Sequence, residues 1–409
     1  MSEDKIPKGW IESNLECICE ITSSKRIFAK EYQTSGIPFF RGKEVTEKFK
    51  GYEVSTELFI TKEKFDQIKE KYGVPNENDI LLTSVGTLGN PYLVEKDFEF
   101  YFKDGNITWF KNFIDADPKF LFYWLISPQG KENLSNAQIG STQQAYTMTA
   151  LRRVELVLPS LQEQKAIAKV LTAFDDKIES LRTQNQTLET LAQTIFKEWF
   201  GKYQVGDELP EGWRVGKLGE VTNICGGTTP STKNPDYWDG EISWTSPKDL
   251  SNSKEMFLLS TERKITEEGL KKISSGLLPK GTLLLSSRAP IGYLSFTNIE
   301  LAINQGFIAL LPNQYLSNQY MYLWLNSFMK VVESAGNGST FLEISKTSFK
   351  NIECVIPEKN ILKQFVDSIN PIFDKILSNL NQIQSLTKTK DTLLPRLMSG
   401  VLRVKEFQK

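Results

Sequence analysis

Apolar residues recur at alternating spacings of three and four between residues 161 and 200, which is the pattern of a helix in a coiled coil. No glycine or proline lies between Leu161 and Phe200, so we predict one helix of about 40 residues, roughly 60 Å long. Such a helix needs a partner to cover its apolar stripe. The positions of this seam, one of them polar, are Leu171, Phe174, Ile178, Leu181, Asn185, Leu188, Ala192, Ile195 and Trp199.

A similar seam predicts the partner helix within residues 360–400. Its positions are Ile369, Phe373, Ile376, Leu380 and Ile383, and it weakens at Thr387 and Lys390. Pro371 predicts that this helix begins or kinks there, because proline cannot donate the backbone hydrogen bond of a helix interior. We expect an antiparallel pair. Asn185 on the first seam is then a register-setting residue or, alternatively, a tolerated polar substitution.

Short alternating runs ahead of both helices predict β-strands, and they belong to a long repeat. GSTQQAYTMTALRRVELVLP (140–159) returns as GSTFLEISKTSFKNIECVIP (338–357), 198 positions later, and both end in a strand-like run stopped by proline. Matching pairs elsewhere include IPKGW (6–10) with LPEGW (209–213), and NDILLTSVGTLG (78–89) with KGTLLLSSRAPIG (280–292). A period near 200 residues indicates a tandem duplication of domains, because solenoid repeats span only about 20–50 residues.

These patterns predict an α+β fold. Two mixed α/β domains form a pseudo-two-fold tandem repeat, separated by two long antiparallel coiled-coil-like helices. The expected segments are a mixed domain at 1–159, a spacer or dimerisation helix at 160–203, a second mixed domain at 204–357, and a second spacer helix with a tail at 358–409. In such an arrangement the tail lies near the first residues, so the chain is organised as a circle cut at one point.

Composition narrows the chemistry. The chain has no histidine, which excludes Ser-His-Asp and Cys-His catalysis and H-E-x-x-H metalloproteolysis. Its four cysteines include no C-x-x-C pair, and buried thiols are expected. The net charge of −1 does not by itself indicate a nucleic-acid-binding protein. Binding to a phosphate backbone would therefore require basic residues clustered in space or charge supplied by a partner. The chain shows neither a membrane span nor a signal peptide, and we expect a cytoplasmic protein.

Candidate enzyme motifs are incomplete. NPDYW (234–238) resembles the N-P-P-Y/F motif of amino-methyltransferases, but its third residue is aspartate and no glycine-rich turn stands upstream to hold S-adenosylmethionine. Pro235, Asp236 and Glu241 begin a PD-(D/E)xK nuclease pattern, but Ser243 occupies the place of its lysine. GNGST (336–340) lacks the G-K-S/T of a phosphate loop. We therefore expect a binding protein that catalyses no reaction and holds no cofactor or metal.

The whole constellation resembles the specificity subunit of a type I restriction-modification system. Each mixed domain is introduced by I/L-P-x-G-W, is closed by G-S-T and a strand ending in proline, and is followed by a long helix. The most specific parts are the stretch that begins GSTQQAYTMTALRRVELVLP, LAQTIFKEWF, the stretch that begins LPEGWRVGKLGEVTNICGGTTPST, and LLPRLMSGVLRV. The first domain departs from the pattern, since LECICEITSSKRI stands in the place of GEVTNICGGTTPST.

The resemblance implies a non-catalytic DNA-recognition subunit. Its mixed domains would be target recognition domains, each reading one half of a bipartite sequence in double-stranded DNA. Its helices would set the spacer and dock two modification (adenine methyltransferase) subunits, which carry S-adenosylmethionine. Restriction (motor-nuclease) subunits, which use ATP and Mg, can then join.

Base reading needs hydrogen-bond donors and acceptors on loops or helix starts, so the candidates are the polar residues beside the repeated turns. The first-domain candidates are Thr83, Ser84, Thr87, Ser141, Thr142, Gln143 and Gln144. The second-domain candidates are Ser286, Ser287, Arg288, Ser339, Thr340 and Lys346. The repeated Gly-Ser-Thr favours a structural or phosphate-binding role. The better specificity candidates differ between the halves: Gln143 and Gln144 against Phe341 and Leu342, and Val85 and Gly86 against Ser287 and Arg288. Trp124 and Trp324 sit in apolar helical runs and are expected in the core.

Two alternatives remain open at this point. The chain could be the specificity component of a related system in which methylation and cleavage share one partner chain. It could also be a helical scaffold whose mixed domains bind protein and not DNA.

Overall fold

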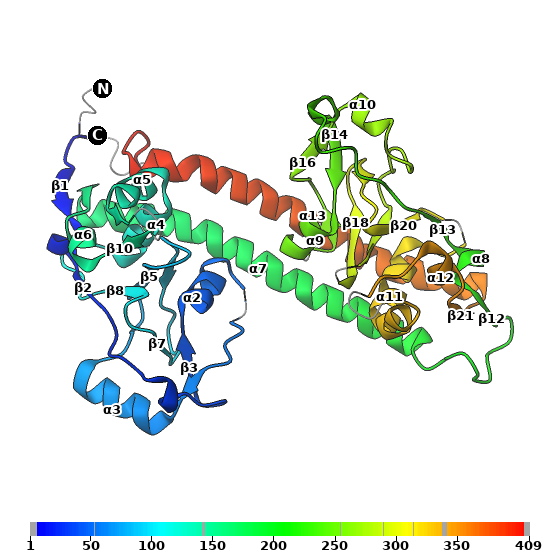
Figure 1. The fold of residues 1–409 in the computed structure, drawn as a ribbon, viewed down its shortest axis with the longest axis horizontal. Coiled ribbons are helices and arrows are strands. Elements are labelled where there is room, and N and C mark those ends of the chain that lie inside the picture. Colours follow the sequence, from blue (N-terminus) through cyan, green and yellow to red (C-terminus); the bar gives the residue numbers. More distant parts are fainter. Residues whose placement is uncertain are drawn as a thin grey trace. The chain divides into compact units, whose positions relative to one another are not determined.

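The computed structural model describes residues 6–52, 54–140, 144–253, 255–288, 290–313, 315–337 and 342–404 (Figure 1). Its internal contacts divide the chain into two compact units. Unit 1 combines residues 1–178 with residues 386–409, and unit 2 consists of residues 179–385. The four segments predicted from the sequence divide the chain at other positions, and that division stays a prediction.

Unit 1 contains a mixed domain and one end of each long helix. Its strands are β1 (Ile11–Asn14), β2 (Glu20–Thr22), β3 (Ile37–Phe40), β4 (Phe59–Ile60), β5 (Ile80–Thr83), β6 (Pro91–Leu93), β7 (Tyr101–Phe102), β8 (Ile107–Lys111), β9 (Gln138–Ile139), β10 (Ala145–Tyr146) and β11 (Glu155–Leu158). Its helices are α1 (Leu15–Ile18), η1 (Ala29–Glu31), α2 (Gly42–Phe49), α3 (Lys62–Tyr72), α4 (Pro118–Ile126), α5 (Pro128–Asn136) and α6 (Met148–Arg152).

A four-stranded sheet of order β2-β8-β5-β6 forms the centre of unit 1. Its middle strands β5 and β8 are almost entirely buried, because their short apolar runs face packed side chains on both sides. A second sheet, of order β4-β3-β7, adds a smaller layer. β1 pairs with β11 with Ile11 opposite Leu158, so the first strand of the domain is tied to the strand that precedes the long helix.

Unit 2 repeats this plan. Its strands are β12 (Arg214–Lys217), β13 (Asn223–Cys225), β14 (Trp238–Thr245), β15 (Phe257–Leu258), β16 (Arg263–Ile265), β17 (Leu283–Ser287), β18 (Ile291–Thr297), β19 (Ala302–Ile303), β20 (Phe307–Leu311) and β21 (Glu353–Ile356). Its helices are α8 (Leu218–Val221), η2 (Pro235–Tyr237), α9 (Pro247–Ser253), α10 (Glu267–Leu270), α11 (Asn318–Ser334) and α12 (Lys346–Lys350).

The sheets of unit 2 correspond to those of unit 1. The main sheet has the order β13-β20-β17-β18-β15, the smaller one has the order β16-β14-β19, and β12 pairs with β21. β13, β20, β17 and β18 thus stand in the places of β2, β8, β5 and β6. The predicted tandem repeat of α+β domains is confirmed, as are the strands predicted at the ends of the two repeated stretches.

The two long helices are α7 (Leu161–Phe200) and α13 (Lys359–Met398), each of 40 residues. The prediction for α7 is confirmed. Pro371 was predicted to begin or to kink the second helix. A start at Pro371 is wrong, because α13 begins at Lys359 and is one helix through the proline. Ile369 and Phe373, on either side, are buried, while Pro371 itself is exposed. Packing of the apolar seam therefore outweighs the lost backbone hydrogen bond.

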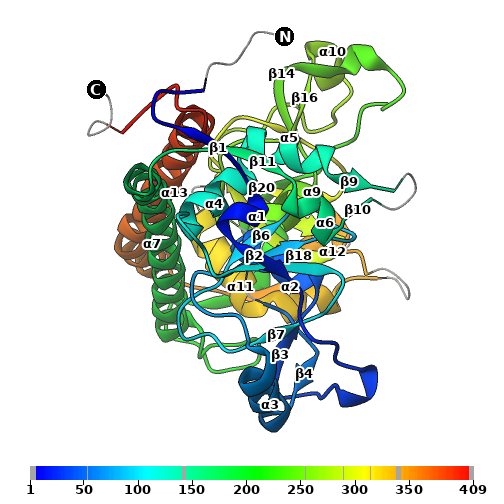
Figure 2. The ribbon, with the colours of Figure 1, turned by 90° about the vertical axis from the view of Figure 1, so that its left-hand side faces the viewer.

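In each unit the ends of α7 and α13 lie side by side and antiparallel (Figures 1 and 2). In unit 2, Asn379 Nδ2 donates to Asn185 Oδ1 at 2.8 Å, and the rings of Trp199 and Phe365 lie 5.7 Å apart. Residues farther along α7 contact residues nearer the start of α13, as expected for an antiparallel pair. Asn185 and Asn379 are both buried, so the polar position on the seam has a matched polar partner on the facing helix.

The segment after α13 returns to the start of the chain within unit 1. A Cβ atom added to Gly400 would lie 2.6 Å from the ring of Pro7, and Arg403 Nη1 donates to the carbonyl oxygen of Lys8 at 3.0 Å. Leu397 and Met398 are buried in the same core as Trp10. These contacts confirm the prediction that the tail lies near the first residues of the chain.

Candidate nucleic-acid interface

In unit 1, several loops meet at one edge of the main sheet. β2 and β5 both run antiparallel to β8, so the ends of β2 and β5 lie beside the start of β8. Ser84 N–H donates to the carbonyl oxygen of Asn106 at 2.8 Å, and Tyr146 N–H donates to that of Ser84 at 3.0 Å. Gly105 N–H also donates to Ser23 Oγ at 3.4 Å. We call the surface formed by residues 23–26, 84–89, 104–106 and 144–146 loop edge 1.

The same edge exists in unit 2. Ser287 N–H donates to the carbonyl oxygen of Gly306 at 2.8 Å, and Ile344 N–H donates to that of Ser287 at 3.0 Å. We call the surface formed by residues 226–229, 287–288, 304–306 and 342–346 loop edge 2. Gly227 is required here, because a Cβ atom at this position would lie 1.8 Å from the carbonyl oxygen of Ile303.

Four of the predicted DNA-contacting residues lie at the ends of β5 and β17 with their side chains buried: Thr83, Ser84, Ser286 and Ser287. Thr83 Oγ1 accepts from the backbone N–H of Asn90 at 3.0 Å, and Ser84 Oγ is bonded to Thr108 Oγ1 at 2.7 Å. Ser286 Oγ accepts from the N–H of Tyr293 at 2.8 Å. Thr83, Ser84 and Ser286 thus use their hydroxyls to hold the edges together, and DNA contact by the four residues stays a prediction.

Four other predicted residues are open to solvent to some degree. Thr87 and Gln144 are exposed on loop edge 1, and Lys346 is exposed on loop edge 2. Arg288 is half-buried, and its Nη1 lies 3.8 Å from Glu343 Oε1 on the facing segment. The structure therefore gathers the sequence candidates of each domain on one edge. Ser141, Thr142, Gln143, Ser339 and Thr340 lie outside the described residues.

Sequence reasoning missed a polar pair at the corner of each edge. On loop edge 1, Arg26 Nε donates to Asp104 Oδ2 at 2.8 Å. On loop edge 2, Thr229 Oγ1 donates to Gln305 Oε1 at 2.7 Å. A register match of the strands that flank these loops, in addition to the match of the repeated motifs, would have pointed to them.

Cys225 ends β13, directly before loop edge 2. Burial raises the pKa of the Cys225 thiol, while the nearby Lys346 ammonium acts in the opposite direction. The thiol therefore stays protonated and is a poor nucleophile. In the part of the chain that the structure describes, no three His, Cys, Asp or Glu side chains are grouped so that they could hold a metal ion. No described helix is long and apolar enough to cross a membrane.

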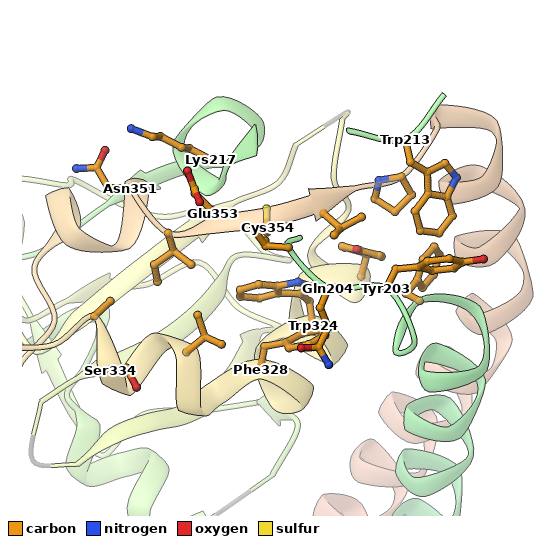
Figure 3. Close-up of a pocket in the computed structure, with 18 residues that line it drawn as sticks. Tyr203, Gln204, Trp213, Lys217, Trp324, Phe328, Ser334, Asn351, Glu353 and Cys354 are labelled. Carbon is orange, nitrogen blue, oxygen red and sulfur yellow. The ribbon is translucent and has the colours of Figure 1, made fainter. Parts of the chain in front are cut away.

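A cavity of about 620 Å³ lies elsewhere in unit 2, where the end of α7 meets α11 and β21 (Figure 3). Trp324, Phe328, Tyr203 and Trp213 line it, with Lys217 and Glu353 at the β12 and β21 side. α11 kinks at Phe328, and in unit 1 the corresponding helix ends at Ser127, where α5 begins. Gly130 of α5 lies against the backbone carbonyl of Trp124. Trp124 and Trp324 are both buried, which confirms the prediction that they belong to the cores.

Comparison with known proteins points to one family. The sequence model described as "Type I restriction modification DNA specificity domain" matches residues 7–190 and again residues 210–388. The MjaIX specificity subunit of Methanocaldococcus jannaschii, a type I restriction enzyme subunit, is 27% identical, and the match covers 98% of this chain and 96% of that protein. The HindI specificity subunit of Haemophilus influenzae is also 27% identical, with 69% of this chain and 77% of that protein covered.

One solved structure has a similar fold. The S subunit of a type I restriction-modification system from M. genitalium superposes with a TM-score of 0.58 at 19% sequence identity, over 97% of each chain. This likeness concerns the arrangement of the backbone. It agrees with the tandem organisation that the repeated motifs and the two matched sheets establish independently.

Proposed function

The chain belongs to the type I restriction-modification DNA specificity family, and from this premise we propose that it reads a bipartite target in double-stranded DNA, one half-site with each mixed domain. The observation that carries the proposal is the repetition of one loop edge on two equivalent sheets. The backbone hydrogen bonds of the two edges match, whereas their solvent-facing side chains differ. A protein that reads two different half-sites needs this combination.

Sequence reading at these edges would use direct contacts to base edges. Arginine and lysine donate to guanine, and asparagine and glutamine pair with adenine. The solvent-accessible residues Gln144 and Arg288 supply such groups, and Thr87 adds an exposed hydroxyl. Exposed Lys346, at the start of α12, would contact a phosphate. Buried hydroxyls hold the neighbouring backbone in place. The net charge of −1 leaves little sequence-independent attraction to phosphates, so we expect partner subunits to supply much of it.

The helix pair would carry the partners and set the spacer between half-sites. Two modification subunits with adenine methyltransferase activity would dock on α7 and α13, and restriction subunits with motor-nuclease activity would join that complex. In this proposal the chain catalyses no reaction and binds no cofactor. S-adenosylmethionine belongs to the modification subunits, and ATP with Mg belongs to the restriction subunits. The complex would work in the cytoplasm, where its DNA substrate lies.

The test is to express the chain together with its modification (adenine methyltransferase) partner and to sequence methylated adenines in the host genome. We expect one split motif, methylated on both strands. A stable complex without any motif would refute DNA reading and favour a protein scaffold. A partner chain that both methylates and cleaves would identify the related fused system.

A further inference from the structure

The first members of the corner pairs, Arg26 and Thr229, occupy equivalent positions in the two units. Thr22, opposite Trp109, ends β2, and Cys225, opposite Ala309, ends β13. Arg26 lies four residues after Thr22, and Thr229 lies four residues after Cys225. Their partners precede the corresponding strands β8 and β20 but differ by one position: Asp104 matches Asn304, and Gln305 matches Gly105. One corner of the shared backbone therefore carries an arginine–aspartate pair in unit 1 and a threonine–glutamine pair in unit 2.

The pair in unit 1 presents a guanidinium group to solvent. The side chain of Arg26 is 68% exposed, whereas that of Asp104 is only 20% exposed. Asp104 engages Nε, and among the described residues the structure records no hydrogen bond for the two terminal nitrogens of Arg26. A guanidinium held at Nε can direct these two nitrogens to the O6 and N7 atoms of guanine, which is the commonest specific contact of arginine with DNA.

The pair in unit 2 presents an amide in the same way. Thr229 and Gln305 are both exposed, and the hydroxyl of Thr229 donates to Oε1 of Gln305. This bond orients the amide, and it leaves Nε2 and the second lone pair of Oε1 for a ligand. Glutamine pairs in this manner with the N7 and N6 atoms of adenine.

Neither pair is needed to hold the fold. Exposed polar pairs contribute little to stability, and the neighbouring backbone hydrogen bonds to Ser84 and Ser287 already fix the corner. Gly105 in unit 1 stands in the place of Gln305, so the backbone forms this corner with or without that side chain. At this corner the two domains share a backbone but expose different side chains. A protein that recognises two different half-sites requires such positions.

We infer that Arg26 and Gln305 are specificity-determining residues, with Arg26 reading a guanine of the first half-site and Gln305 an adenine of the second. Asp104 and Thr229 are their positioning residues. This inference rests on the proposed function and adds two residues that lie outside the repeated motifs.

The test uses the assembled methyltransferase complex and the methylated motif in cells. Arg26→Ala is expected to relax one guanine position of the first half-site and to leave the second half-site unchanged. Gln305→Ala is expected to relax one adenine position of the second half-site only. The preference for the original base, roughly 5- to 150-fold for a bidentate contact, should fall toward one. Arg214→Ala is the matched control, because Arg214 is an exposed, ion-paired arginine on β12, outside both loop edges, and it should keep the full motif.

The outcomes separate this inference from the proposed function. Absence of a split motif with the unchanged chain would refute the proposed function itself. A split motif that both alanine variants leave intact would overturn the inference alone. Arg26→Ala could abolish methylation altogether. In that case, binding of the purified complex is measured to four duplexes that differ only in the base proposed to contact Arg26. Equal loss for all four bases would also overturn the assignment, and a shift of preference toward adenine in Arg26→Gln would support it.

Discussion

Arg403→Gln tests the ion pair that joins the segment after α13 to the start of α7. Arg403 donates from Nε to Glu163 Oε1 at 2.8 Å and from Nη2 to Oε2 at 2.6 Å. These bonds raise the pKa of the Arg403 guanidinium above its ordinary value. Ile361 corresponds to Glu163 in the other half, and Gln204 corresponds to Arg403 when Gly201 is matched with Gly400. These residues suggest the replacement pair.

The magnitude follows from burial. Glu163 is 1% exposed and Arg403 is 21% exposed, so removal of the arginine leaves a carboxylate in the interior. Breaking a buried pair costs about 3–5 kcal/mol, and breaking an exposed one costs at most about 1 kcal/mol. Because one partner is buried and the other is partly solvated, we expect a loss of about 3 kcal/mol. For a unit of this size that corresponds to a fall of roughly 6–12 °C in the unfolding midpoint.

Thermal unfolding measures the loss, and hydrogen–deuterium exchange shows which unit is affected. Exchange should rise in unit 1 near β1 and the start of α7, and unit 2 serves as the internal reference. The double variant Glu163→Ile with Arg403→Gln should recover most of the stability, because no charge is then left unpaired. An unchanged midpoint together with unchanged exchange in Arg403→Gln would refute the argument.

Three further predictions concern other parts of the molecule. Asn185→Leu should lower the free energy of unfolding, measured by urea denaturation, by about 1–3 kcal/mol, because buried Asn379 loses its hydrogen-bond partner. Adding Asn379→Leu should restore stability. A single variant as stable as the unchanged chain would contradict this. Burial raises the pKa of the Glu189 carboxyl from 4.5 to about 7, so its ionisation destabilises the fold progressively between those values. Glu189→Gln should therefore be more stable than the unchanged chain at pH 8, with a gap that closes toward pH 4.5, and a gap independent of pH would exclude this cause. Lys346→Ala should weaken binding of the assembled complex to all duplexes. The slope of the logarithm of the binding constant against the logarithm of the salt concentration should fall in magnitude by about one, as expected for a lost phosphate contact. A changed methylation motif would instead show that Lys346 contacts a base.

The sequence predicts the large elements of this fold because each has a strong periodic signal. The seam from Leu171 to Trp199 has no competing explanation, and α7 follows it. Pro371 was misjudged for a physical reason. Its local effect on a helix is unfavourable, but the buried residues Ile369 and Phe373 beside it belong to a tertiary contact that a local rule does not contain.

The candidate sites were predicted less completely. Residues beside the repeated turns do meet at the loop edges, because a repeat preserves the backbone that positions them. Arg26 and Gln305 were missed because neither has a matching residue in the other half: Thr229 corresponds to Arg26, and Gly105 corresponds to Gln305. A search for repetition favours what is conserved between the halves, whereas specificity depends on what is not.

Unit 1 is built from two separate segments of the chain, which affects how it folds during synthesis. Its core includes Leu394, Leu397 and Met398, yet the ribosome makes residues 179–385 between the two parts of this core. At roughly 5–20 residues per second, unit 1 waits on the order of 10–40 s with its apolar surface incomplete. A chain that stops early therefore leaves the first recognition domain unfinished while the second can already be folded. Only a chain translated through α13 can present both half-site readers, so incomplete products are excluded from a working complex by their own folding.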